Sequence, residues 1–157
     1  MKSNHRSARS PSFKNYTSSS KRASDCLARN RSADTKCERI LRSTLWRKGL
    51  RFRKNVQNLP GRPDVVFPSD RVVVFCDGDF WHGRDWSSRL RKLKRGANSS
   101  YWIAKIKNNI ERDRLHTKEL RKMGWRVIRI WETDILADAE EAATAVFKEL
   151  TSRRINF

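Results

Sequence analysis

Residues 72–83 read VVVFCDGDFWHG, and this stretch decides how the rest of the chain is arranged. Its first half is a short, almost wholly apolar run, which predicts a buried strand. Its second half places two aspartates, two aromatic residues and a histidine among glycines. The end of a purely structural strand needs only turn formers and solvated side chains. We therefore expect a more specific arrangement of side chains where this strand ends.

Three further segments predict the remaining strands of a sheet. Residues 50–56, LRFRKNV, alternate apolar and charged side chains, and residues 61–67, GRPDVVF, follow a Pro-Gly break. Because short connections join these two segments to residues 72–77, we expect three antiparallel neighbours. Residues 125–132, WRVIRIWE, predict a further buried strand.

A first helix is predicted within residues 31–49. Ser32 or Asp34 can cap its start, and Gly49 ends it. Its apolar stripe consists of Ile40, Leu41 and Leu45. Glu38 lies on the same side of this helix, so we expect its carboxylate to point toward the core.

A second helix is predicted over residues 101–124, and a third over residues 137–154. The stripe of the second helix has an aspartate where an apolar residue is due, and it comprises Ile103, Ile106, Ile110, Asp113, Thr117 and Leu120. The basic residues 84–100 are expected to form a surface loop. The predicted order is αβββαβα, an α/β (α+β) fold with a mixed β-sheet flanked by helices.

Charge and length limit the classes of function. The chain has 157 residues, enough for one domain plus a tail, and its formal charge is +19. Such an excess of positive charge favours a polyanionic partner, with nucleic acid preferred over an anionic membrane. No apolar run approaches the roughly 20 residues that span a bilayer, and no N-terminal signal segment is present, so we expect a soluble, cytoplasmic protein. Residues 1–20, rich in Ser and Arg, are expected to be a disordered basic tail.

Four polar side chains form the candidate chemical site. A carboxylate turned inward must be paired, hydrogen-bonded or bound to metal, and Glu38, Asp64 and Asp113 are all expected near the core or at strand ends. Salt bridges with the many arginines are the alternative for each one alone. Taken together with His82, they favour a shared site. Carboxylate and carbonyl oxygens suit Mg²⁺, and an oriented histidine can act as a general base.

The aromatic residues have two interpretations. Phe80 and Trp81 can cap the core, or they can enter a DNA base stack as wedges. Trp102, at the start of the second helix, can belong to the same surface. The remaining tryptophans, Trp46, Trp125 and Trp131, lie in apolar patterns and are expected in the core.

Five ordered motifs resemble the very short patch repair (Vsr) mismatch endonucleases, which have a restriction-endonuclease-like core. They lie between about residues 22 and 135 and read ARNRSADTKCE, LPGRPDVVF, VVVFCDGDFWHG, YWIAKIKNNIERDR and LRKMGWRVIRIWE. The resemblance implies a Vsr-like endonuclease domain over residues 21–157. It also implies a metal-dependent DNA endonuclease that hydrolyses phosphodiesters.

The resemblance assigns roles to individual residues. It implies that Asp64 is the central ligand of one or two Mg²⁺ ions, with the Cys76 backbone carbonyl as another ligand and Glu38 acting through water. It implies that His82 is the base and that Asp113 orients it. The residues implied to contact DNA are Phe80, Trp81, Trp102, Arg62 and Arg84. Residues 72–83 would then bring metal ligand, base and wedge to one strand end.

The chain also departs from the family pattern. Family members hold a structural zinc with His and Cys residues after the FWH motif and a Cys after the last strand. The corresponding residues here are GRDW and Thr133, and Asp79 replaces a Cys. Three cysteines, Cys26, Cys37 and Cys76, show no zinc spacing. We therefore expect no structural zinc and free thiols.

The first functional hypothesis is an endonuclease that nicks duplex DNA beside a T:G mismatch. It is expected to act as a monomer, with repair proteins or a partner DNA methyltransferase system as candidate partners and the nucleoid as its place in a bacterial-type cell. The alternative is a Vsr-like nuclease with another target, restriction-like or homing, which makes a site-specific nick or double-strand cut. A second alternative is a non-catalytic basic nucleic-acid-binding protein. The four polar side chains argue against it, because a binder gains nothing from acids that face phosphates.

Overall fold

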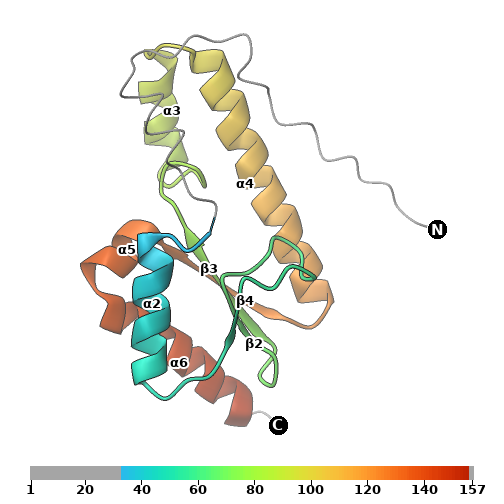
Figure 1. Cartoon of the computed structure of the whole chain (residues 1–157). Coiled ribbons are helices and arrows are strands. Elements are labelled where there is room, and N and C mark those ends of the chain that lie inside the picture. The colour runs from blue at the N-terminus through green and yellow to red at the C-terminus, as the bar shows by residue number, and fades with distance from the viewer. Residues whose placement is uncertain (1–32, 156–157) are drawn as a thin grey trace, which may run out of the picture. The chain divides into compact units, whose positions relative to one another are not determined.

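The computed structural model of the chain describes residues 33–155, and Figure 1 shows their helices and strands. These residues form two compact units. Residues 80–114 form the helical unit, and residues 33–79 with 115–155 form the sheet unit. The predicted basic tail, residues 1–20, lies outside the described residues, so the tail and the domain boundary both stay predictions.

The sheet unit has one mixed four-stranded sheet. Its strands are β1 (Arg53–Lys54), β2 (Val65–Phe67), β3 (Val72–Asp77) and β4 (Arg126–Trp131), in that spatial order. β1 and β2 pair antiparallel, as do β2 and β3, whereas β3 and β4 pair parallel. The prediction of three antiparallel neighbours is confirmed, and so is the prediction of a mixed sheet flanked by helices.

Helices α2 (Lys36–Arg47), α5 (Glu132–Ala137) and α6 (Ala139–Ile155) pack on one face of this sheet. The core between helices and sheet is aliphatic, and its fully buried members include Leu41, Leu45, Val65, Val72, Val74, Ile135 and Val146. On the opposite face, Val66, Val73, Phe75 and Leu120 form a smaller cluster. Alternate strand residues thus serve opposite faces, as the two-residue period of a strand requires.

The start of α2 differs from the prediction. Its N-cap is Thr35, whose hydroxyl accepts a hydrogen bond from the Glu38 backbone N–H, so Asp34 is not the cap, and Ser32 lies outside the described residues. Glu38 also accepts a hydrogen bond from the Thr35 hydroxyl. Threonine followed three residues later by glutamate is a capping box, a pattern that the sequence contained.

Trp46 is another correction, because its side chain is 55% exposed and does not belong to the core. It follows the buried Leu45 by one residue, a rotation of about 100° around α2, so its side chain points away from the apolar stripe. Trp125 does pack against the smaller cluster. Trp131 ends β4 and is half-buried.

The helical unit contains α3 (Trp86–Lys94) and the first part of α4 (Ser99–Lys122). The prediction of a surface loop over residues 84–100 was wrong for α3. Its leucines, arginines and lysines are good helix formers, and their charge hid this propensity. The usual start signal is also missing, since the N-cap Asp85 has a left-handed backbone and makes no capping hydrogen bond. No helix among the described residues combines the length and apolar composition needed to cross a membrane.

Candidate active site

Asp64 lies at the start of β2, where the sheet brings it beside the end of β3. Its backbone N–H donates to the Val74 carbonyl at 3.1 Å, which extends the β2–β3 ladder by one residue. Its side-chain Oδ2 accepts a hydrogen bond from the Cys76 backbone N–H at 2.7 Å. The expectation that neighbouring strands bring Asp64 to the Cys76 backbone is confirmed.

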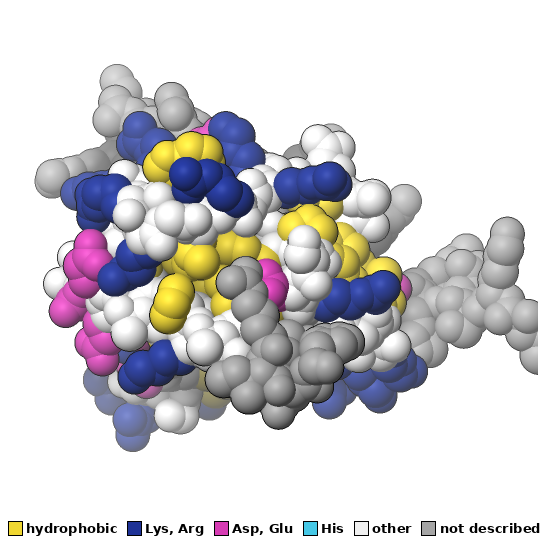
Figure 2. Space-filling view, turned by 90° about the horizontal axis from the view of Figure 1, so that it is seen from below, with side chains coloured by type: hydrophobic (Ala, Val, Ile, Leu, Met, Phe, Trp, Pro, Cys, Tyr) yellow, Lys and Arg dark blue, Asp and Glu magenta, His cyan; other side chains and the backbone are white. Residues whose placement is uncertain are grey.

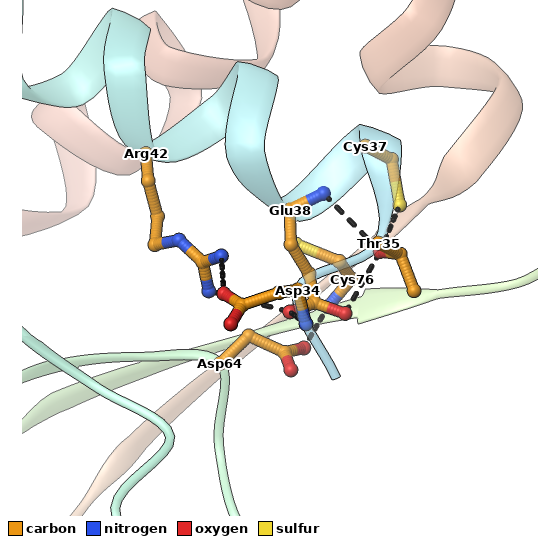
Figure 3. Close-up of polar contacts among 7 residues, drawn as sticks. All are labelled: Asp34, Thr35, Cys37, Glu38, Arg42, Asp64 and Cys76. Carbon is orange, nitrogen blue, oxygen red and sulfur yellow. Dashed lines mark hydrogen bonds and ion pairs between the residues drawn. The ribbon is translucent and has the colours of Figure 1, made fainter. Parts of the chain in front are cut away.

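Glu38 reaches the same region from the first turn of α2, as Figure 3 shows. Its carboxylate is 4% exposed and accepts hydrogen bonds from the Asp34 N–H at 2.9 Å and the Thr35 hydroxyl at 2.8 Å. Arg42 pairs with Glu38 at 3.2 Å and also with Asp34. The expected inward direction of Glu38 is confirmed, and part of its charge is balanced by a salt bridge.

The electrostatics of Asp64 favour a cation. The pKa of the Asp64 carboxyl is raised from 3.8 to about 7, mainly by burial and to a smaller extent by the charges of Glu38 and Asp77, while the hydrogen bond from Cys76 acts to lower it. A divalent cation would offset both the desolvation and the repulsion. Burial also raises the pKa of the Cys76 thiol, so its sulfur stays protonated and only its main chain suits a hard metal.

The donor set therefore fits a metal that takes few protein ligands. Among residues 33–155, no three His, Cys, Asp or Glu side chains are grouped to hold an ion by themselves. Mg²⁺ commonly uses one or two carboxylates and completes its shell with water and substrate phosphate. Asp64, with main-chain oxygen and water, matches this requirement. The absence of a structural zinc stays a prediction.

A salt bridge that sequence reasoning missed lies at the end of β3. Asp77 is 4% exposed, and its two carboxylate oxygens accept from Arg129 Nε at 2.6 Å and Nη2 at 2.7 Å. Arg129 also donates to the Thr117 hydroxyl at 3.3 Å and lies over the Phe75 ring. The sequence feature that could have indicated this salt bridge is an arginine inside the apolar run of β4. This bridge joins the ends of the parallel strands β3 and β4.

In the helical unit, His82 and Asp113 form a close pair. His82 Nδ1 lies 2.5 Å from Asp113 Oδ2, and the two side chains are 24% and 15% exposed. A carboxylate that holds Nδ1–H leaves Nε2 as the acceptor of a neutral imidazole. The aspartate in the apolar stripe of α4 thus has the partner that the sequence predicted.

The segment that carries His82 is fixed on α4 by two further contacts. Asn109, 5% exposed, donates from its side-chain amide to the Trp81 carbonyl at 2.9 Å. Gly83 has φ +72°, and a Cβ there would come within 2.5 Å of Ile110 Cδ1. The backbone can approach α4 this closely only because the residue is glycine.

Phe80, Trp81 and Trp102 form one aromatic cluster in the helical unit. Their ring centroids are 5.1 to 5.9 Å apart, and all three side chains are half-buried. Tyr101 stacks edge-on against Trp102 at 4.9 Å but is 8% exposed and belongs to the interior. The three half-buried rings therefore satisfy both interpretations, since they pack together and keep exposed surface.

The two arginines predicted to contact DNA lie in different units. Arg62 is exposed and precedes Pro63 in the loop before β2, with φ 54°. Arg84 lies in the helical unit, and its carbonyl accepts from Arg89 Nε at 3.4 Å. The sheet unit thus brings Asp64, Glu38 and Cys76 together, and the helical unit brings together His82, Asp113 and the aromatic cluster.

Comparison with known proteins gives consistent matches. The profile of the family described as DNA mismatch endonuclease Vsr matches residues 15–88. The type II nicking enzyme V.NmeDIP of Neisseria meningitidis serogroup C is 42% identical over 77% of this chain and 80% of its own length. V.HpaIIP of Haemophilus parainfluenzae, also named a type II nicking enzyme, is 36% identical over 80% and 88%. DNA mismatch endonuclease Vsr of Escherichia coli is 41% identical over 63% and 62%.

Proposed function

This chain belongs to the Vsr family of DNA mismatch endonucleases, and we propose that it is a Mg²⁺-dependent enzyme that nicks one strand of duplex DNA at a defined target. The membership makes it a DNA endonuclease, that is, a phosphodiester hydrolase. The relatives named type II nicking enzymes match more of the chain than the E. coli Vsr does. This observation favours a target of the nicking-enzyme type over the T:G mismatch alone.

We assign the metal to the sheet unit. Asp64 is the proposed direct ligand, because its buried carboxyl gains most from a cation. The N–H and C=O of one strand residue point to the same neighbour, so we expect the Cys76 carbonyl to face the edge where its N–H meets Asp64. Glu38 is proposed to hold a metal-bound water. One or two Mg²⁺ ions would there neutralise charge on the phosphate and lower the pKa of bound water.

We assign the proton transfer to the helical unit. His82 is the proposed general base, because Asp113 fixes its Nδ1 and orients Nε2. A water oxygen attacks phosphorus, its proton moves to His82 Nε2, and the phosphorus bond to the leaving oxygen breaks. Asp113 stabilises the imidazolium that forms. Phe80, Trp81 and Trp102, with Arg62 and Arg84, are proposed to contact the DNA.

The test is cleavage of supercoiled plasmid and of duplexes labelled on either strand, with and without Mg²⁺. We expect open-circular rather than linear plasmid, and product from one labelled strand only. Linear plasmid at the earliest times would contradict nicking and would indicate a double-strand cut. Equal cleavage in the presence of a chelator would contradict the metal assignment. The monomeric state and the partner proteins stay predictions.

A second candidate target is the T:G mismatch, and the half-buried aromatic cluster favours it. A wedge costs least where base stacking is already weak. We expect Trp81→Ala to weaken binding to a mismatched duplex more than to the matched duplex. Phe147→Ala removes an exposed aromatic side chain of α6, outside this cluster, and is the matched control. Equal losses of affinity for both duplexes would indicate that the aromatic cluster serves only to pack the protein interior.

A further inference from the structure

Three basic side chains project from the edge of the sheet. β1 is the outer strand, and its two residues, Arg53 and Lys54, are both exposed. Arg51 precedes them, is also exposed, and lies with its guanidinium 3.8 Å from the centre of the Trp46 ring. Arg51 also donates to the Leu50 carbonyl at 3.3 Å, so its position is fixed before any partner binds.

The neighbouring basic residues are different, because they already have an acidic partner. Glu140 pairs with Arg47 at 3.1 Å and with Lys48 at 2.9 Å. Within residues 33–155, no carboxylate forms an ion pair with Arg51, Arg53 or Lys54. On the face drawn in Figure 2, Lys and Arg side chains are widespread, whereas Asp and Glu gather mainly at the left side of the view.

The pairing of β1 with β2 places this edge, with its three basic residues, near the proposed metal ligand. Lys54 pairs with Val65, and the next backbone contact joins Asn55 N–H to the Asp64 carbonyl at 3.4 Å. Lys54 is therefore one step of the ladder from Asp64, and Arg51 lies farther along the edge. Three residue steps cover at most about 11 Å. Adjacent phosphates of one DNA strand lie farther apart than their 3.4 Å rise along the axis, because the strand winds around it, so about two phosphates fit this length.

We propose that Arg51, Arg53 and Lys54 form a phosphate track that binds the backbone of the DNA beside the cleaved bond. This inference rests on the proposed function, because it takes Asp64 as the point where the scissile phosphate binds. The track accepts any sequence, since phosphates carry no base information. Its partner is duplex DNA, recognised by charge.

A simpler role for these residues is protection of the sheet edge. Charged side chains on an outer strand, lysine above all, discourage pairing with the edge of another copy. This role needs no DNA and predicts self-association when the charges are removed. The phosphate track instead predicts a loss of salt-dependent DNA affinity in a protein that stays unassociated.

The experiment compares two double variants that each remove one Arg and one Lys. Arg53→Ala with Lys54→Ala removes part of the track, and Arg47→Ala with Lys48→Ala removes the pair held by Glu140. Affinity for a 40-base-pair duplex would be measured by fluorescence anisotropy in a chelator, from low to physiological salt. For the track variant we expect affinity about tenfold lower at low salt and a salt slope reduced by about two. For the control we expect affinity within about twofold and an unchanged slope.

Equal losses in the two variants, or an unchanged slope in the track variant, would overturn the phosphate track. Sedimentation of both variants reports self-association, and association without a change of slope would assign the edge-protection role. Arg53→Glu with Lys54→Glu should weaken DNA binding further than the alanine substitutions do. A loss of affinity no larger than that of the alanine variant would also contradict the phosphate track. Nicking by the parent protein is read separately, so a parent that binds DNA through the track without nicking would refute the proposed function alone.

Discussion

The two units of this enzyme differ in how far their acidic and aromatic side chains are buried. In the sheet unit Glu38 and Asp77 are withdrawn from water, and each forms an ion pair with an arginine, Arg42 and Arg129 respectively. In the helical unit the reactive side chains are half-buried, and α3 has no buried residue. The sheet unit concentrates negative charge in a rigid core, whereas the helical unit presents aromatic and basic surface.

The difference indicates which properties each half of the chemistry needs. A hard cation requires fixed oxygen ligands, and a strand ladder with a packed helix supplies them. The proposed contact with DNA requires exposed surface, and the clustered aromatic rings of the helical unit are only half-buried. Substitutions in the two units should therefore fail in different ways.

The largest effect is expected for Asp64→Asn. It removes the charge of the proposed metal ligand but none of the basic groups, and a metal contributes several kcal/mol to charge stabilisation. At about 1.4 kcal/mol per tenfold, we expect cleavage at least about 10³-fold slower. DNA affinity in a chelator should be unchanged or higher. Full activity at ordinary Mg²⁺ would refute the assignment, and weaker binding would indicate a damaged fold.

His82→Ala comes next and tests the helical unit. Loss of a general base typically costs about 10²-fold or more, and we expect this loss under conditions where chemistry limits turnover. Asp113→Asn keeps the volume of the orienting residue but removes its charge. We expect its cleavage rate to lie between that of His82→Ala and that of the parent protein. Single-turnover cleavage is the measurement. A rate that does not change in His82→Ala would assign the base to another group.

Gly83→Ala probes how closely the His82 segment packs on α4. The new Cβ would lie 2.5 Å from Ile110 Cδ1 at a residue with φ +72°. Gly49 is the matched control, because its φ is +79° and nothing lies within 4 Å of its Cβ position. We expect a loss of about 1 kcal/mol for Gly49→Ala and about 2–4 kcal/mol for Gly83→Ala. Equal losses in chemical denaturation would mean that Ile110 moves aside at little cost.

The last prediction concerns stability against pH. Because the native state raises the pKa of Asp64 to about 7, it holds this proton more tightly than the unfolded chain does. The stabilisation is complete below about pH 4 and is lost as the pH rises to about 7. Asp64→Asn cannot titrate, so its Tm should fall less over this window, by roughly ten degrees. Melting curves without divalent cations test this, and parallel pH profiles would contradict it.

Much of the sheet unit was predictable because its patterns are periodic. The alternation in residues 50–56 and the apolar run of β3 predicted the antiparallel strands, and the stripe of α2 placed Glu38 toward the core. The stripe of α4 likewise marked Asp113 as inward, and His82 is its partner. These features depend on local spacing, which a sequence states directly.

The features that were missed depend on contacts between distant residues or on a surface without a pattern. Asp77 and Arg129 are adjacent only because β3 and β4 pair parallel, with Phe75 opposite Arg129. Helix α3 buries no residue, and its short apolar stripe of Trp86, Leu90 and Leu93 lies among many basic residues, so its charges indicated a loop. Trp46 is apolar, but it lies on a side of α2 that does not face the sheet, one residue past the buried Leu45. In each case the tertiary arrangement determined the structure, and local propensity alone was insufficient to predict it.

The connectivity of the sheet has a kinetic consequence. Residues 68–71 join β2 to β3, whereas residues 78–125 join β3 to β4. Closing a long loop costs more chain entropy than closing a short one, and pairing between distant segments slows folding. We expect the hairpin of β2 and β3, with its contact between Asp64 and Cys76, to form in the folding transition state and β4 to add afterwards. Destabilising substitutions in the hairpin should then slow refolding, while those in β4 should mainly hasten unfolding, which stopped-flow kinetics can separate.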